Sequence, residues 1–274
     1  MIKLFTDSTS YIPSDILLEY DISVLPLNII IGDKEILETE ITNEHFYKQL
    51  RKSHHAAQTT PLSAQEIQDA FEKEVQKTHA VLAIFLSSKV SKTYQNACTA
   101  KDNLIEIYPK ASITIIDSES VAMEEGLAVL AAAQAIKSGE WLEEAEIAAQ
   151  TTRQQTKFLF IPDTLKYLKL AGLLGRAQSL LAGALQITPI LHSTEGEVGL
   201  LETVRAKSRA LKRIFEIFEE DIKAYGVTNI IVHHIDSFDE AVEFAKKVEH
   251  IAGIPVSICD IGPVVGANVG PGAI

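Results

Sequence analysis

Short apolar runs alternate with helix-forming segments along most of the chain, and this alternation predicts the fold class. Ile2 to Phe5, Ala80 to Phe85 and Ala111 to Ile116 are apolar runs of strand length, and helix-forming segments lie between them. The alternation returns between Asn229 and Cys259. Strands that alternate with helices are typical of α/β folds with a parallel sheet covered on both faces. We therefore expect an α/β protein whose first sheet is mostly parallel.

The pattern restarts near Lys157, which divides the 274 residues into two predicted α/β domains, 1–156 and 157–274. In the second domain we expect a helix that Asp163 caps, a long amphipathic helix over 204–225, and a glycine-rich loop from Gly262 to Gly272. A glycine-rich segment after a strand usually allows a close approach to the backbone.

Turn and capping signals divide the first domain further. Residues 22–31 read as one strand, and the following Gly32-Asp33 predicts a hairpin turn. Ser63 and Glu66 have the spacing of a capping box, so a helix should start there. Thr59 and Thr60 are then expected in a loop just before that helix.

Composition and charge exclude several classes of protein. A content of 46% hydrophobic and 23% charged residues favours a folded chain over a disordered one. The net charge of −12 argues against nucleic acid or an anionic membrane as the main partner. The apolar stretch 121–136 carries Glu124 and Glu125 and is too short to span a bilayer, so no integral membrane segment is expected. The N-terminus enters a strand at once, which favours a cytoplasmic protein.

Hydroxyl side chains gather where the predicted strands of the first domain end. The junctions 6–10, 87–93 and 117–120 are rich in Ser and Thr, and the 59–60 pair resembles them. Ligands of parallel sheets bind at the carboxyl ends of the strands. The segment 87–96 also opens a helix, and a helix N-terminus favours a negative charge. We predict that this loop holds an anionic head group, a carboxylate.

Other chemistries have weaker support in the sequence. The pairs His54-His55 and His233-His234 could each offer one metal ligand at most, because neighbouring residues on a strand point to opposite faces. No G-x-S-x-G motif is present. Asp7 and Asp117 follow strands, where hydrogen bonding to the next turn is the plainer interpretation. The alternative is a small-molecule hydrolase or phosphotransferase that uses Asp7 or Asp117 as a base.

Several segments, taken in order, resemble the DegV family over nearly the whole chain. The segments that carry the resemblance are Thr6-Asp7-Ser8-Thr9-Ser10, Thr59-Thr60-Pro61-Leu62-Ser63, Ser87 to Ala97, Asp117-Ser118, Thr164 to Lys169, Ile187 to Leu191 and Gly266 to Gly272. The resemblance implies two α/β domains with a long-chain fatty acid, such as palmitate, bound between them. It implies a lipid-binding subunit rather than an enzyme, with no cofactor, that can present the acid to a separate fatty acid kinase for acyl-phosphate formation.

The resemblance also implies the roles of individual residues. Thr59, with Thr60 beside it, and Ser91 would hold the carboxylate, and the N–H of Lys92 would help. Asn268 in the closing loop and Arg205 match further positions of the family. The family usually has Gly where this chain has Lys92, and His where it has Asn268.

One further departure from the family bears on partners. Where the family often reads Gly-Gly-Arg, this chain has Ala171-Gly172-Leu173, with Arg176 displaced. That basic position resembles part of a kinase-docking surface. A third hypothesis is a ligand-free interaction protein in which Lys92 and Asn268 close the site.

Overall fold

The computed structural model describes residues 1–52, 57–174 and 187–274 of the chain. Contacts within the chain divide it into two units. Unit 1 comprises Met1–Glu40, Gln58–Thr156 and Glu195–Glu197, and unit 2 comprises Ile41–Ala57, Lys157–Thr194 and Val198–Ile274. The boundary expected after residue 156, as a division between domains that fold independently, stays a prediction.

Unit 1 contains a four-stranded parallel sheet, as the sequence predicts. Its strand order is β2-β1-β6-β7. The strands are β2 (Ile22–Leu25), β1 (Ile2–Asp7), β6 (Ala80–Phe85) and β7 (Ile113–Asp117). Leu4 pairs with Leu82 and Leu82 with Thr114, all in parallel register. The four strands therefore end at a common edge.

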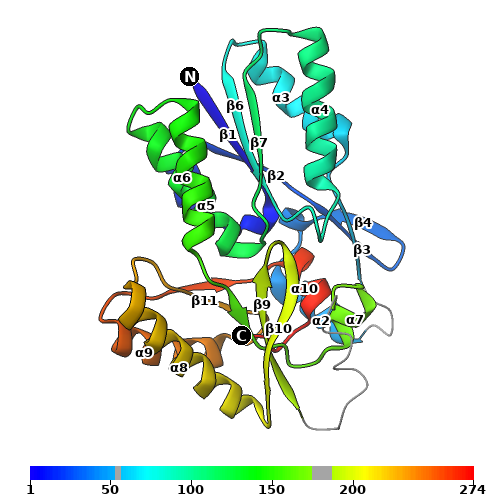
Figure 1. Cartoon of the computed structure of the whole chain (residues 1–274). Helices are drawn as coiled ribbons and strands as arrows, with labels where there is room; N and C mark the ends of the chain where they lie inside the picture. Colours follow the sequence, from blue (N-terminus) through cyan, green and yellow to red (C-terminus); the bar gives the residue numbers. More distant parts are fainter. Residues whose placement is uncertain (53–56, 175–186) are drawn as a thin grey trace. The chain divides into compact units, whose positions relative to one another are not determined.

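Helices cover both faces of this sheet. They are α1 (Ser14–Glu19), α3 (Ala64–Val75), α4 (Thr93–Ile107), α5 (Ala122–Lys137) and α6 (Leu142–Gln155). In Figure 1, α5 and α6 lie on one face of the sheet and α3 and α4 on the other. Residues 82–85 of β6 are fully buried, which explains their continuous apolar run. The capping box of Ser63 and Glu66 at the start of α3 is confirmed.

A second, antiparallel sheet of unit 1 has the order β4-β3-β5 and corrects two expectations. Its strands are β3 (Asn28–Ile31), β4 (Lys34–Leu37) and β5 (Gln58–Thr60). The single strand expected over 22–31 is two strands in different sheets, because Pro26 has no N–H for a ladder. The 59–60 pair lies in β5 rather than in a loop, since Pro61 and two β-branched side chains favour an extended backbone.

Unit 2 combines a three-stranded antiparallel sheet with a parallel pair of strands. The strands are β8 (Leu159–Phe160), β9 (Thr188–Thr194), β10 (Glu197–Val204), β11 (Ile231–His234) and β12 (Ser257–Asp260). The helices are α2 (Asn43–Lys52), α7 (Lys166–Leu170), α8 (Lys207–Tyr225), α9 (Phe238–Ala252) and α10 (Pro263–Val269). Asp163 does not cap α7, because Leu165 is the residue before the helix and the Thr164 hydroxyl accepts the Lys166 N–H at 3.2 Å.

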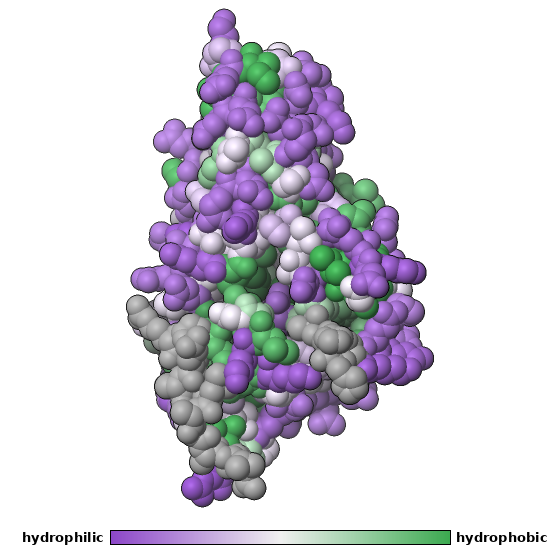
Figure 2. Space-filling view, turned by 90° about the vertical axis from the view of Figure 1, so that its right-hand side faces the viewer, coloured by the Kyte–Doolittle hydropathy of each residue, from purple (hydrophilic) through white to green (hydrophobic). Residues whose placement is uncertain are grey.

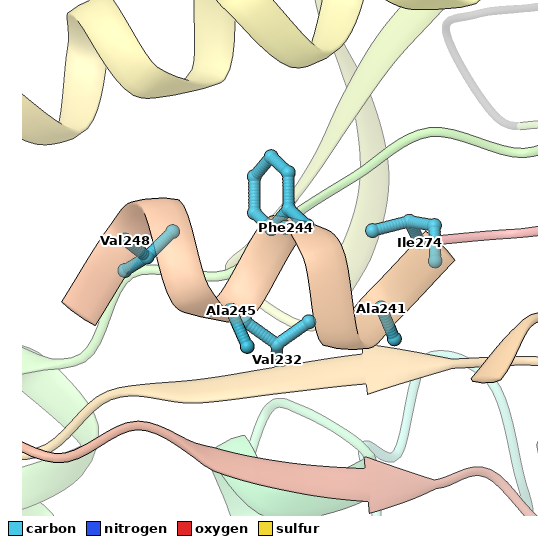
Figure 3. Close-up of a cluster of buried hydrophobic side chains, with 6 residues drawn as sticks. All are labelled: Val232, Ala241, Phe244, Ala245, Val248 and Ile274. Carbon is cyan, nitrogen blue, oxygen red and sulfur yellow. The ribbon is translucent and has the colours of Figure 1, made fainter. Parts of the chain in front are cut away.

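One core cluster of unit 2 joins α9 to β11. Figure 3 shows Ala241, Ala245 and Val248 on α9 with Val232 of β11. The Phe244 ring of α9 stacks on the Phe215 ring of α8, with the ring centroids 4.4 Å apart. This stacking fixes α8 against α9.

The glycine-rich segment at the chain's end contains a helix, where the sequence predicts a loop. Pro263 occupies the first turn of α10 and Gly270, with φ of +90°, ends it. A Cβ on Gly266 would lie 2.0 Å from the Tyr47 hydroxyl oxygen, and one on Gly270 would lie 2.1 Å from the Tyr167 ring. The expected close approach to this backbone is therefore made by side chains of the protein itself.

The surface is mostly polar on the face that Figure 2 shows, with hydrophobic residues in separate patches. This agrees with the 37 acidic and 25 basic residues of the chain. Among the described residues, no helix is long and apolar enough to cross a membrane.

Candidate functional site

The hydroxyl-rich loops of unit 1 meet at the carboxyl edge of the parallel sheet. They follow β1, β6 and β7, which are neighbours in the strand order. The 3₁₀ helix η1 (Ser8–Ser10) follows β1, and residues 86–92 connect β6 to α4. The chain adds β2 on one side of β1 and β6 on the other, so the direction of strand addition reverses between β1 and β6. Such a switch point is where α/β sheets usually bind ligands.

Asp7 connects the first two loops. Its Oδ1 accepts the Thr9 N–H at 2.8 Å, and its Oδ2 accepts the Leu86 N–H at 2.8 Å. The side chain is fully buried. Burial raises the pKa of Asp7, and its hydrogen bonds to Thr9 and Leu86 oppose that rise. Asp7 therefore binds the turn that follows it, as the sequence predicts, and also the start of the loop after β6.

Asp117 connects the second and third loops in the same way. Its Oδ1 accepts the Glu119 N–H at 2.9 Å and the Ser88 N–H at 3.2 Å. Arg153 supports this loop, since its Nη1 donates to the Asp117 carbonyl at 3.1 Å and lies 3.2 Å from a Glu119 carboxylate oxygen. Both aspartates therefore stabilise the loops by accepting backbone N–H groups, which weakens the case for either as a catalytic base.

Ser91 and Lys92 lie immediately before α4. The Ser91 Oγ accepts the Thr93 N–H at 3.2 Å and lies 3.0 Å from the Thr93 hydroxyl. Lys92 is the residue before the helix, and its side chain is exposed. The first N–H groups of a helix have no partner within it, so this turn offers donors to an anion.

The Thr59–Thr60 segment is tied to the same helix start. Both threonines are half-buried in β5, paired with Ile29 and Asn28 of β3. The Leu62 N–H donates to the Thr93 hydroxyl at 3.3 Å, and the Leu62 carbonyl accepts the Asn96 side-chain amide at 2.6 Å. The strand that carries Thr59 therefore ends beside the loop that carries Ser91.

Asn268 and Arg205 belong to unit 2. Asn268 lies in α10, where its side-chain amide donates to the Val264 carbonyl at 2.9 Å. Arg205 is exposed just before α8. A common binding role for these two residues and Thr59, Thr60, Ser91 and Lys92 of unit 1 stays a prediction.

Sequence reasoning singled out the segment 87–96 but missed the distant partners of its side chains. The Ser87 hydroxyl donates to the Gly196 carbonyl at 2.8 Å, and Thr93 and Asn96 hold Leu62. Their partners lie far along the sequence, so no local pattern signals them. Sequence reasoning also missed that Glu125 approaches Asp7. The charge of Glu125 inside an apolar helix was the available signal.

Some expectations concern other parts of the chain. His54-His55 and Arg176 lie outside the described residues. Among the residues described, no group of three or more His, Cys, Asp or Glu side chains could hold a metal ion. His233 packs on the Phe158 ring and His234 on the Phe238 ring, with ring centroids 5.1 and 5.6 Å apart.

The chain is similar, in sequence and in fold, to proteins of one family. All residues, 1–274, match the family described as "Uncharacterised protein, DegV family". A DegV domain-containing protein of Clostridium acetobutylicum is 37% identical over 273 residues, covering 100% of this chain and 95% of that protein. The crystal structure of DegV, a fatty acid binding protein from Bacillus subtilis, gives a TM-score of 0.89 at 27% identity, over 99% of this chain and 96% of that one. A fatty acid binding DegV family protein from Streptococcus agalactiae gives 0.90 at 26% identity, over 100% and 96%.

Proposed function

The chain belongs to the DegV family, and on that premise we propose that it binds a long-chain fatty acid such as palmitate. The structural relatives from Bacillus subtilis and Streptococcus agalactiae are described as fatty acid binding proteins. The observation that carries the proposal is the start of α4, where hydroxyl and backbone donors gather at the switch point of the sheet. In this proposal Ser91, Thr59 and Thr60 hold the carboxylate, and the Lys92 N–H donates to it.

The chemistry of this edge suits holding an anion. A carboxylate accepts hydrogen bonds from hydroxyl and N–H groups, and such charge-assisted bonds are the stronger ones. Asp7 and Asp117 are already bonded to backbone N–H groups of the loops. Their negative charge is therefore used to order the loops rather than presented to a ligand.

The acyl tail would supply most of the binding free energy. Burial of a chain contributes about 0.8 kcal/mol per methylene, so about fifteen methylenes contribute on the order of 10 kcal/mol. This outweighs the cost of removing the carboxylate from water when donors meet it. Asn268 and Arg205 of unit 2 would add polar contacts in this proposal.

We further propose that the chain presents the bound acid to a separate fatty acid kinase in the cytoplasm. In this role the chain binds and orients the substrate, and the kinase performs the transfer of the phosphoryl group. Adding the purified protein to a bacterial fatty acid kinase with ATP and palmitate should produce acyl phosphate. If the kinase produces acyl phosphate with its own binding subunit but not with this protein, presentation to the kinase is contradicted, whereas fatty acid binding is not.

Native mass spectrometry and lipid uptake test the binding proposal. The purified protein should carry a fatty acid, and delipidated protein should take up palmitate in a titration. The proposal would be overturned if delipidated protein took up no fatty acid of about 14 to 18 carbons, the range that includes about fifteen methylenes.

A pair of variants on α4 and its loop tests the head-group contact. Ser91→Ala should weaken palmitate binding about 10- to 100-fold, because a hydrogen bond to a charged group contributes about 1.5–3 kcal/mol. Thr99→Ala is the matched control, since Thr99 is exposed and its hydroxyl donates to the Gln95 carbonyl of the same helix at 3.1 Å. Equal affinity in the two variants would remove Ser91 from the site.

A further inference from the structure

A pair of buried carboxyl groups lies beneath residues 86–92, the loop that carries Ser91 and that we call the head-group loop. Asp7 ends β1 and Glu125 lies in the first turn of α5, and each is 0% exposed. Helix α5 packs closely here, because a Cβ on Gly126 would lie 2.7 Å from the Ser10 carbonyl oxygen. Both carboxyl groups are therefore buried among protein atoms, and each of their oxygens has a hydrogen-bond partner within the protein.

The partners of the pair are all hydroxyl or backbone N–H groups. The Thr6 hydroxyl donates to Glu125 Oε1 at 3.0 Å. The Thr9 hydroxyl lies 2.6 Å from Asp7 Oδ1 and 3.1 Å from Glu125 Oε2. In the described part of the chain, no lysine, arginine or histidine forms an ion pair with either carboxyl group.

A count of protons shows which group is neutral. The Thr9 hydroxyl has one proton, and its shorter contact gives that proton to Asp7. The contact between Thr9 and Glu125 then lacks a proton unless Glu125 supplies one. Asp7 already receives two backbone N–H groups, which stabilise its charge, whereas Glu125 receives none among the bonds found. Two buried carboxylates without a cation are unfavourable, so one of them keeps its proton.

We propose that Glu125 is a positioning residue that, as a neutral carboxylic acid, donates a hydrogen bond to the Thr9 hydroxyl. The Thr9 hydroxyl in turn donates to Asp7, and this arrangement holds Asp7 on the Leu86 N–H at the start of the 86–92 loop. This inference rests on the proposed function, since the loop after Leu86 carries Ser91. Asp7 then carries the one negative charge of the pair beside the loop backbone. Because Glu125 is neutral, it adds no second negative charge that would repel the bound carboxylate.

The charged groups around the pair agree with this assignment. Burial, followed by the charge of Asp7, holds the pKa of Glu125 well above its ordinary 4.5. The N-terminus of α5 favours a negative charge and opposes this rise. Other carboxyl groups nearby are engaged elsewhere: Glu124 contacts Ser120, and Glu38 contacts Ser8 and Tyr11.

The raised pKa gives a direction to the pH dependence. Folding takes up a proton at Glu125, so this contribution to stability is complete below pH 4.5 and is lost as the pH rises through the raised folded-state pKa. Deprotonation at alkaline pH should also loosen Asp7 from Leu86. Wild-type affinity for palmitate should therefore fall at alkaline pH more than that of a variant that cannot lose this proton.

The test compares wild type with Glu125→Gln and Glu125→Ala, each as the full chain. A glutamine side chain keeps an N–H donor and an acceptor oxygen at this position. The Glu125→Gln variant should therefore bind palmitate within about twofold of wild type at neutral pH, and its affinity should change little at alkaline pH. Alanine removes the donor to the pair and should weaken binding about tenfold. The infrared difference spectrum, wild type minus Glu125→Gln, should contain the C=O stretch of a protonated carboxylic acid at neutral pH.

Two results would overturn the inference. One is an infrared difference spectrum without the acid band, and the other is a Glu125→Gln variant that binds as weakly as Glu125→Ala with an unchanged pH profile. Failure of the proposed function is distinguishable from both. In that case wild type takes up no palmitate, while the acid band and the alkaline loss of thermal stability persist.

Discussion

Single side chains order the loops at the edge of the parallel sheet. Asp7 and Asp117 each accept one N–H from the turn that follows them and one from the loop after β6. The local bonds could be predicted from the strand-end positions, because aspartate commonly bonds to the next turn. The bonds to Leu86 and Ser88 could not, since they depend on which strands are neighbours.

Gly196, in the turn between β9 and β10, provides a prediction at this scale. Its φ is +82°, and a Cβ there would lie 2.4 Å from the Ser87 hydroxyl that donates to its carbonyl. Gly196→Ala should lower the free energy of unfolding by about 2–3 kcal/mol. The left-handed backbone costs a non-glycine residue about 1–2 kcal/mol and the lost hydrogen bond about 1. Urea unfolding measures the change.

Gly139→Ala is the control for Gly196→Ala. Gly139 has a φ of +89°, and no atom lies within 4 Å of a Cβ built there. This substitution should therefore cost only the conformational part, about 1–2 kcal/mol. If both substitutions cost the same, the contact between Ser87 and Gly196 contributes nothing to stability.

At the scale of elements, the sequence predicts best where local and tertiary preferences agree. Strand β6 has continuous apolar residues and α3 has a capping box, and both form where expected. The helix α10 was missed because glycine at 262, 266 and 270 disfavours a helix locally. Tyr47 takes up the space above Gly266, and a contact between residues so distant in sequence leaves no local pattern.

The contact of α2 with the start of α10 provides the prediction for this scale. The buried Tyr47 hydroxyl lies 2.6 Å from the Ile261 carbonyl oxygen and 3.0 Å from that of Gly262. Tyr47→Phe should lower the free energy of unfolding by about 1–3 kcal/mol, because buried carbonyl groups lose their donor. Tyr225→Phe, at an exposed position, should leave stability unchanged in the same urea titration. Equal effects of the two substitutions would show that the Tyr47 hydroxyl does not hold α10.

At the scale of the whole molecule, family, fold class and charge could be predicted from the sequence. The parallel sheet of unit 1 and the match over residues 1–274 confirm the first two. The pairing of Thr59 with Ser91 at a head group stays a prediction, because a shared ligand is a property of neither segment alone.

The stability of the whole chain should depend on His233 at acid pH. Burial, followed by the charge of His234, lowers the pKa of His233 from 6.5 to about 4. The unfolded chain binds this proton first, so stability falls as the pH drops from 6.5 toward 4. The fall is at most about 3 kcal/mol, from about 1.4 kcal/mol per unit of pKa.

Unfolding of His233→Gln between pH 7 and pH 4 measures this effect. The variant should lose less stability over the interval than wild type. His250→Gln, at an exposed position near the end of α9, should follow wild type. A His233→Gln variant with the wild-type pH profile would contradict the prediction.

The position of α2 along the sequence has a consequence for the synthesis of the protein. Helix α2 lies between two segments of unit 1, yet its Tyr47 bonds to Ile261, 214 residues later. A nascent chain exposes α2 early, while Ile261 is still untranslated. Domains generally fold as units as they leave the ribosome. Unit 2 therefore cannot form completely until Ile261 and Gly262 have been made, and until then α2 lacks the carbonyl groups that its tyrosine binds.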